Sequence, residues 1–335
     1  MDLHAFCRSL PKIELHAHLN GSVSSCTLKK LRKLQFSGAE FNQDIENDKD
    51  PLSLEEFFES IDIVHQLTNT PNAIFKVSCD VIKEFWEDNV IYLELRSTPR
   101  EVEGSMTKKE YILAIIRAIE MCKIECPNIL VKLLISVNRK HGYDAAKENI
   151  ELAISMHKEY LDIVGIDLSG DPTQGDVFIE LLDKCRKVGL KISAHCAEVP
   201  NEIEVMDIIN FKPDRLGHCT CVHPNLGGSQ LLFDMLLRSK IPVELCLTSN
   251  VKCKTVPSYE SHHFKYLYEN GHPLCISTDD KGVFNTSLSE EFRLVSQHFG
   301  LKKEDLNDIS KASVQFAFVT EEEKAKLTAV INNFC

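Results

Sequence analysis

The sequence lacks long hydrophobic runs and an excess of positive charge. No stretch reaches the roughly 18 uninterrupted apolar residues of a membrane-spanning helix, and Met1 to His4 carries none of the basic character of a secretory signal. Lys and Arg number 38 against 50 Asp and Glu, which gives a net charge of −12. Because such a charge repels nucleic acid and anionic lipid, we expect neither as a partner.

Paired cysteine spacings, internal repeats and low-complexity linkers are also missing. The 13 cysteines are odd in number, show no C-x-x-C spacing and lie mostly inside apolar runs, as Cys246 and Cys275 do. This pattern is typical of reduced thiols in the cytoplasm. Without repeats or linkers, residues 1–335 are expected to form one domain, and we expect a monomer.

Short apolar runs alternate with segments of helical periodicity along the whole chain. The runs predict eight buried parallel strands: Lys12–Leu19, Val90–Ser97, Val131–Asn138, Val164–Ser169, Lys191–His195, Arg215–His218, Pro242–Thr248 and Leu274–Thr278. Eight such units without an internal boundary favour an α/β fold of the closed (β/α)₈ barrel type, with additional helices from Ser287 to the C-terminus. The alternative is an open, doubly wound sheet.

Three helix starts are marked by capping-box spacings. These are Ser53 with Glu56, Thr107 with Glu110, and Ser287 with Glu290. The acidic segment 38–51 predicts a surface loop within the long connection between the first two strands.

The informative positions are polar residues at the ends of predicted strands, because barrels gather their active sites there. His16 and His18 are two residues apart on an extended strand and so project from the same face. An H-x-H pair is a weak signal alone, and two satisfied histidines are its ordinary explanation. His195, His218 and the pair Asp279-Asp280 end further strands, which makes chance a poor explanation.

Three imidazoles and one carboxylate form a ligand set suited to one zinc ion, with iron or manganese as less favoured occupants. Four histidines are available for three ligand positions, and their spacing in the sequence does not show which three bind the metal. Asp279 and Asp280 point in opposite directions if extended, so one can bind metal and the other substrate. Glu198 lies three residues beyond His195, at the barrel mouth, where partial desolvation would make it an acid at neutral pH.

Taken together, these residues resemble the adenosine deaminase family of the amidohydrolase superfamily. The resemblance rests on a combination of motifs in a fixed order: His16-Ala17-His18, Ser169-Gly170, His195-Cys196-Ala197-Glu198, Gly217-His218 and Ser277-Thr278-Asp279-Asp280. Four longer runs are similar to the branch of the family that acts on N6-methyl-AMP: 10–22, 94–100, 246–251 and 278–284.

The resemblance implies a single zinc held by His16, His18, His195 and Asp279. Glu198 is implied to donate a proton to purine N1, and His218 to orient the attacking hydroxide and share in its proton transfer. Gly170 and Asp280 are implied to hold the purine edge. Further nucleotide contacts are implied for His18, Asn20, His65, Ser97, Thr98, Pro99, Arg100 and Asn138.

The reaction implied is hydrolytic removal of the C6 amine from a purine nucleoside monophosphate, with N6-methyl-AMP giving IMP and methylamine. An acidic protein needs local positive charge to hold a phosphate, and Arg100 is the candidate, with Arg139 and Lys140 nearby. Two residues depart from the family pattern: Asn138 stands where Asp is expected, and Cys219 where Gly is usual. The alternatives are an adenosine or adenine deaminase without phosphate selectivity and a non-catalytic metal-binding module.

Overall fold

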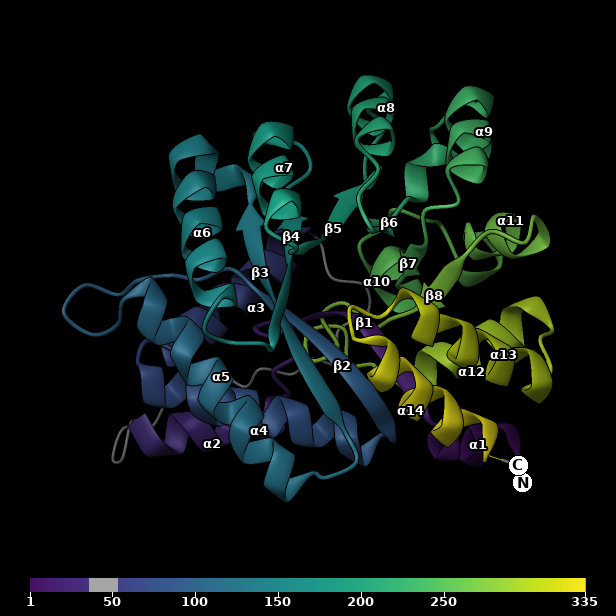
Figure 1. The fold of residues 1–335 in the computed structure, drawn as a ribbon. Helices are drawn as coiled ribbons and strands as arrows, with labels where there is room; N and C mark the ends of the chain where they lie inside the picture. The colour runs from purple at the N-terminus through teal and green to yellow at the C-terminus, as the bar shows by residue number, and fades with distance from the viewer. Residues whose placement is uncertain (36–53, 335) are drawn as a thin grey trace.

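Eight parallel strands form the centre of the computed structural model, which describes residues 1–35 and 54–334 (Figure 1). The strands pair in chain order: β1 Lys12–His18, β2 Val90–Ser97, β3 Leu130–Asn138, β4 Ile163–Ser169, β5 Lys191–Cys196, β6 Arg215–His218, β7 Val243–Leu245 and β8 Leu274–Ile276. A parallel bridge between Ala17 and Asp279 joins the segment after β8 to β1 and closes the barrel. The predicted (β/α)₈ fold is confirmed.

Helices surround the strands on the outside of the barrel (Figure 1). They follow the strands in turn: α2 Ser25–Gln35, α3 Leu54–Leu67, α4 Pro71–Glu87, α5 Lys108–Glu125, α6 Gly142–His157, α7 Ile179–Lys187, α8 Glu202–Phe211, α9 Gln230–Ser239, α10 Leu247–Lys252 and α11 Phe264–Glu269. Among the described helices, none combines the length and apolarity needed to cross a bilayer.

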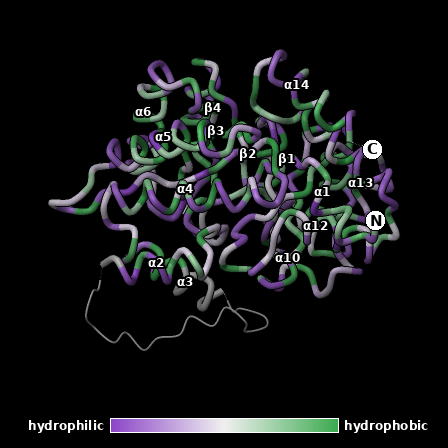
Figure 2. The backbone as a smooth tube through the Cα atoms, turned by 90° about the horizontal axis from the view of Figure 1, so that it is seen from below, coloured by the Kyte–Doolittle hydropathy of each residue, from purple (hydrophilic) through white to green (hydrophobic). Residues whose placement is uncertain are grey.

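The remaining helices bring the two chain ends together. They are α1 Leu3–Ser9, α12 Leu288–Phe299, α13 Lys303–Ser313 and α14 Glu321–Asn332. The rings of Phe6 and Phe334 lie 5.5 Å apart, and Figure 2 shows both ends beside α1, α12 and α13. The additional C-terminal helices predicted from Ser287 onward are therefore present.

Six predicted strands agree with the structure to within one residue at each end, and the last two are shorter than predicted. The strand predicted over Pro242–Thr248 ends at Leu245, and α10 begins at Leu247. The backbone N–H of Thr248 donates to the Glu291 carboxylate at 3.0 Å, so a side chain from α12 satisfies an amide at the start of this short helix. The strand predicted over Leu274–Thr278 ends at Ile276, because the Thr278 N–H donates to Glu14 at 3.0 Å instead of continuing the ladder.

The predicted helix starts have three different outcomes. Thr107 and Glu110 form a complete capping box. Ser287 caps α12 by accepting from the Glu290 N–H, but the Glu290 carboxylate pairs with Arg293 and does not return to the cap. The start predicted at Ser53 and the loop predicted over 38–51 lie outside the described residues.

Candidate active site

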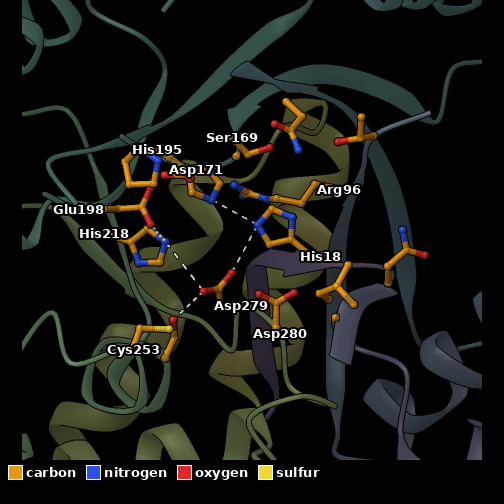
Figure 3. A pocket seen from close by; sticks show the side chains of 18 of the residues that line it. His18, Arg96, Ser169, Asp171, His195, Glu198, His218, Cys253, Asp279 and Asp280 are labelled. Carbon is orange, nitrogen blue, oxygen red and sulfur yellow. Dashed lines mark hydrogen bonds and ion pairs between the residues drawn. The ribbon is translucent and has the colours of Figure 1, made fainter. Parts of the chain in front are cut away.

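A cavity of about 380 Å³ opens where the carboxyl ends of the strands meet (Figure 3). Every strand or the segment that follows it contributes to the lining, with one example each from β1 to β8: His18, Ser97, Asn138, Ser169, His195, His218, Ser249 and Asp279. Barrel enzymes place their active sites at this end. The polar residues that the sequence placed at strand ends therefore share one cavity.

The four predicted metal ligands converge at the base of this cavity. Asp279 Oδ1 lies 3.2 Å from His16 Nε2 and 3.3 Å from His18 Nε2. His18 Nε2 is in turn 3.2 Å from His195 Nε2 (Figure 3). The bridge that closes the barrel carries three of these residues, since the His18 N–H donates to Asp279 O at 3.0 Å and the Asp279 N–H to His16 O at 2.8 Å.

The hydrogen bonds of His16 and His195 leave their Nε2 atoms free to bind a cation. His16 Nδ1 lies 2.7 Å from the Glu244 carboxylate and His195 Nδ1 lies 2.8 Å from the carbonyl oxygen of Leu168. Both oxygens are acceptors, so each Nδ1 carries a proton, and Nε2 is the nitrogen that presents a lone pair whenever the ring is neutral. His16 Nε2 is buried without a hydrogen-bond partner. This nitrogen and oxygen donor set fits a zinc ion.

The charge state of the cluster depends on burial and on Asp167. Burial lowers the pKa of His18 to about 3, so this imidazole is neutral. Burial also acts to lower the pKa of His195, but the Asp167 carboxylate overcomes it and raises that pKa to about 9. A cation bound by His195 must therefore displace a proton.

A buried ionic network beneath the cavity orients these imidazoles, and the sequence analysis missed it. Arg96 donates to Asp167 at 2.8 Å and to Glu244 at 3.0 Å, and Arg215 donates to Glu244 at 2.6 Å and pairs with Glu94. All five side chains are fully buried. Although burial opposes ionisation, the two arginines hold the pKa of Glu244 well below its usual range. The available signal was the presence of charged residues inside otherwise apolar strands, as in Glu94-Leu95-Arg96.

Glu198 and His218 lie side by side in the cavity, just after β5 and at the end of β6 (Figure 3). His218 Nε2 lies 3.8 Å from Glu198 Oε2 and 3.9 Å from Asp279 Oδ2. Burial raises the pKa of Glu198, and the nearby Asp279 carboxylate adds to this effect, whereas His195 opposes it. The surroundings therefore shift Glu198 toward its protonated form close to the predicted metal ligands, the direction that general acid catalysis requires.

Three residues around the site hold left-handed backbone conformations. Ala197, His218 and Asp279 have φ of 54°, 60° and 61°. Such conformations cost about 1–3 kcal/mol for residues other than glycine and cluster at functional sites. They turn the chain at the strand ends, a feature that sequence patterns do not reveal.

Two glycines, Gly21 and Gly170, make room for two residues predicted to contact the nucleotide, Asp280 and Asn138. A Cβ at Gly21 would overlap the Asp280 carboxyl group, with 1.5 Å to its Oδ1. A Cβ at Gly170 would lie 2.2 Å from Asn138 Oδ1. Burial and the adjacent Asp279 carboxylate raise the pKa of Asp280 well above its usual range, so a protonated Asp280 can donate as well as accept a hydrogen bond.

We expect Gly170→Ala to destabilise the protein more than Gly104→Ala. Both glycines have positive φ, +103° and +68°, but a Cβ at Gly104 meets nothing within 4 Å. Gly104→Ala should therefore cost only the backbone penalty of about 1–2 kcal/mol. Gly170→Ala adds the overlap with Asn138. Urea unfolding of both variants measures the difference, and equal losses of unfolding free energy would contradict this reading of Gly170.

Most residues predicted to contact the nucleotide line the opposite side of the cavity: Asn20, His65, Ser97, Thr98, Arg100 and Asn138. Pro99 is not among the lining residues. Tyr111, which was not predicted from the sequence, supports two of these residues from α5 without lining the cavity: its hydroxyl lies 2.6 Å from Ser97 Oγ and 3.3 Å from Asn20 Nδ2. Its position on an amphipathic helix gave no signal of a role in the site.

Arg100 is held by one of its amino groups. Nη2 donates to the His65 carbonyl at 3.0 Å and to Thr68 Oγ1 at 2.7 Å. Nε is buried without a partner. Arg139, expected nearby, instead pairs with Glu204 on α8 and does not line the cavity. Arg100 is thus the arginine placed to receive an anion on this side.

Comparison with known proteins places the chain close to one group of enzymes. The family profile described as "Adenosine deaminase" matches residues 11–334. The chain is 44% identical to N6-Methyl-AMP deaminase of Danio rerio, over 98% of this chain and 96% of that protein. It is also 44% identical to N6-Methyl-AMP deaminase of Homo sapiens, over 96% of this chain and 92% of that protein.

The solved structures agree with these relatives. The crystal structure of Arabidopsis ADAL complexed with IMP superposes with a TM-score of 0.89 at 36% identity, covering 98% of this chain and 97% of that chain. The family resemblance inferred from the sequence motifs is confirmed over nearly the whole chain.

Proposed function

The chain belongs to the adenosine deaminase family, and from this premise we propose that it is a zinc-dependent deaminase of purine nucleoside monophosphates. The favoured reaction is N6-methyl-AMP plus water to IMP plus methylamine. The observation that carries the proposal is the meeting of His195, Asp279 and Glu198 in one cavity, with His16 grouped beside His195 and Asp279, in a chain 44% identical to N6-methyl-AMP deaminases.

His16, His18, His195 and Asp279 would hold the zinc ion. Zinc in such a site lowers the pKa of a water molecule to about 7 and so provides a nucleophile near neutral pH. Glu244 and the Leu168 carbonyl fix the orientation of His16 and His195. Ser249 donates to Asp279 Oδ2 at 2.7 Å, which fixes the carboxylate as well.

Glu198 supplies the proton that the purine ring needs. Protonation at N1 withdraws electrons from C6 and makes that carbon more susceptible to attack by water. Burial raises the pKa of Glu198, the direction needed for an acid that acts near neutral pH. His218, with Nε2 3.9 Å from Asp279 Oδ2, positions the attacking water.

The purine edge and the phosphate are held at separate places in the cavity. Gly170 allows its backbone to approach the base closely, and Asp280 hydrogen-bonds the same edge. Arg100 receives the phosphate, supported by Asn20, His65, Ser97, Thr98 and Asn138. Pro99, between Thr98 and Arg100, fixes its own φ at about −65° and so restricts the backbone of this segment.

The test is turnover of N6-methyl-AMP, AMP and adenosine side by side by wild type and Arg100→Ala, reading released amine and 6-oxo product. We expect wild type to prefer the methylated nucleotide. Because charge-assisted hydrogen bonds to a phosphate contribute about 1.5–3 kcal/mol, Arg100→Ala should lower kcat/KM for the nucleotide about 10- to 150-fold and leave adenosine turnover unchanged.

Arg238→Ala is the matched control, since Arg238 is an exposed residue of α9. It should match wild type on all three substrates. Equal activity of wild type on nucleoside and nucleotide would instead favour an adenosine deaminase without phosphate selectivity. Absence of amine release from every purine, with zinc bound, would favour a non-catalytic metal-binding module.

We further propose that residues 1–335 act as one domain, as a monomer in the cytoplasm. The 12 cysteines among the described residues are all free, as a reducing compartment favours. Size-exclusion chromatography with light scattering tests the oligomeric state.

A further inference from the structure

Two adjacent histidines, His262 and His263, lie behind His218 and are fully buried. They precede α11, and neither belongs to the predicted site. His263 Nε2 lies 2.6 Å from the backbone carbonyl oxygen of His218. Because a carbonyl can only accept, His263 donates this bond, which helps to hold His218 at its φ of 60°.

A directional chain of hydrogen bonds reaches the ring of His218 through His262. The backbone N–H of Phe264 donates to His262 Nδ1 at 3.0 Å. A backbone amide can only donate, so Nδ1 of His262 is unprotonated. Burial holds the pKa of His262 well below its usual range, which keeps the ring neutral with its proton on Nε2.

The side-chain amide of Asn250, on α10, links the two rings by accepting from His262 and donating to His218. His262 Nε2 lies 3.0 Å from Asn250 Oδ1 and donates to it. Asn250 Nδ2 then lies 3.2 Å from His218 Nδ1. An amide nitrogen can only donate, so His218 Nδ1 must accept. The single proton of the neutral His218 ring is therefore on Nε2, the atom nearest Glu198 and Asp279.

We propose that His262 and Asn250 are positioning residues that fix His218 as the Nε2–H tautomer, so that its ring donates a hydrogen bond to the attacking water. In this tautomer the ring offers no lone pair to the cavity. It therefore neither binds the metal nor accepts the first proton from water. The role of His218 toward water rests on the proposed function, whereas the hydrogen bonds that set its tautomer do not.

The hydrogen-bond partners of Nδ1 also distinguish histidines whose roles the sequence spacing left open. His16 and His195 each hold a proton on Nδ1, which leaves Nε2 as the nitrogen that offers a lone pair when the ring binds a cation. His218 has the opposite arrangement, because its Nδ1 faces a donor and not an acceptor. The partners of Nδ1 thus assign His16 and His195 to metal binding and His218 to hydrogen-bond donation.

Nitrogen-15 spectra of histidine-labelled protein measure the tautomer directly. The His218 signals are those lost in His218→Gln. We expect protonated Nε2 and unprotonated Nδ1 in wild type. In Asn250→Asp the new carboxylate can only accept, so the pattern should reverse, with kcat lowered about 10²- to 10⁴-fold and KM little changed.

Variants at His262 separate positioning from simple packing. His262→Gln keeps a side-chain donor for Asn250 and should retain the wild-type tautomer and most of kcat. His262→Leu removes the donor, lets the Asn250 amide rotate and should yield both tautomers of His218. His272→Gln is the matched control, because His272 is another buried histidine, bonded to the Ile241 carbonyl at 2.9 Å and remote from the cavity.

Two results would overturn the proposal: a wild-type His218 protonated on Nδ1, or an Asn250→Asp protein with unchanged tautomer and kcat. The wild-type spectrum decides the tautomer even if a variant does not fold. If the tautomer reverses as expected but no purine nucleotide is deaminated, the proposed function fails and the assignment of the tautomer stands.

Discussion

Replacement of Glu198 by glutamine is expected to lower kcat for N6-methyl-AMP about 10²- to 10⁴-fold, the usual contribution of a positioned general acid. Glutamine has nearly the same shape as a protonated glutamate but has no proton of comparable acidity to give to N1. Glu198 is not one of the predicted metal ligands, so zinc content should stay at the wild-type level. Single-turnover kinetics and elemental analysis of the purified variant measure the two quantities.

Glu202→Gln provides the matched control. Glu202 is exposed at the start of α8, four residues beyond Glu198, and should be replaceable without effect. Wild-type turnover by Glu198→Gln would remove this residue from its proposed role. Loss of zinc from the same variant would show that Glu198 binds the metal or supports its ligands.

His195→Ala, unlike Glu198→Gln, is expected to lose zinc as well as turnover. The substitution removes one Nε2 ligand and leaves Asp167 and the Leu168 carbonyl without their imidazole partner. Without zinc the pKa of water returns from about 7 to its far higher bulk value, so turnover should fall to background. Zinc content after dialysis and amine release measure the two effects.

Thermal unfolding separates loss of metal from loss of fold. A ligand present at 100 times its Kd stabilises the native state by about 2.7 kcal/mol, so added zinc should raise the Tm of the chelator-treated wild type. It should leave the Tm of His195→Ala unchanged, while His4→Ala, at an exposed position on α1, should respond as wild type does. A folded His195→Ala protein with a full complement of zinc would refute the proposed ligand set.

The sequence was sufficient for the strands and for the residues at their ends. Buried parallel strands are short apolar runs, and the period of two along a strand places His16 and His18 on one face. The predicted ends of the last two strands were wrong, because backbone N–H groups there donate to side-chain carboxylates that are distant in the sequence. The Glu291 carboxylate accepts from the Thr248 N–H at the start of α10. The Glu14 carboxylate accepts from the Thr278 N–H, which therefore does not pair with a neighbouring strand.

What the sequence determined by itself was the barrel, the family and the set of residues that meet at one end, because these depend on local periodicity and on motif order. What only the tertiary structure decided was how each side chain is held. The buried Arg96 network, the room left by Gly21 for Asp280 and the bonds from His262 to His218 each join residues far apart in the chain. The physical reason is that a tautomer or a carboxylate charge is set by the atoms that contact it, and those contacts exist only once the barrel has closed.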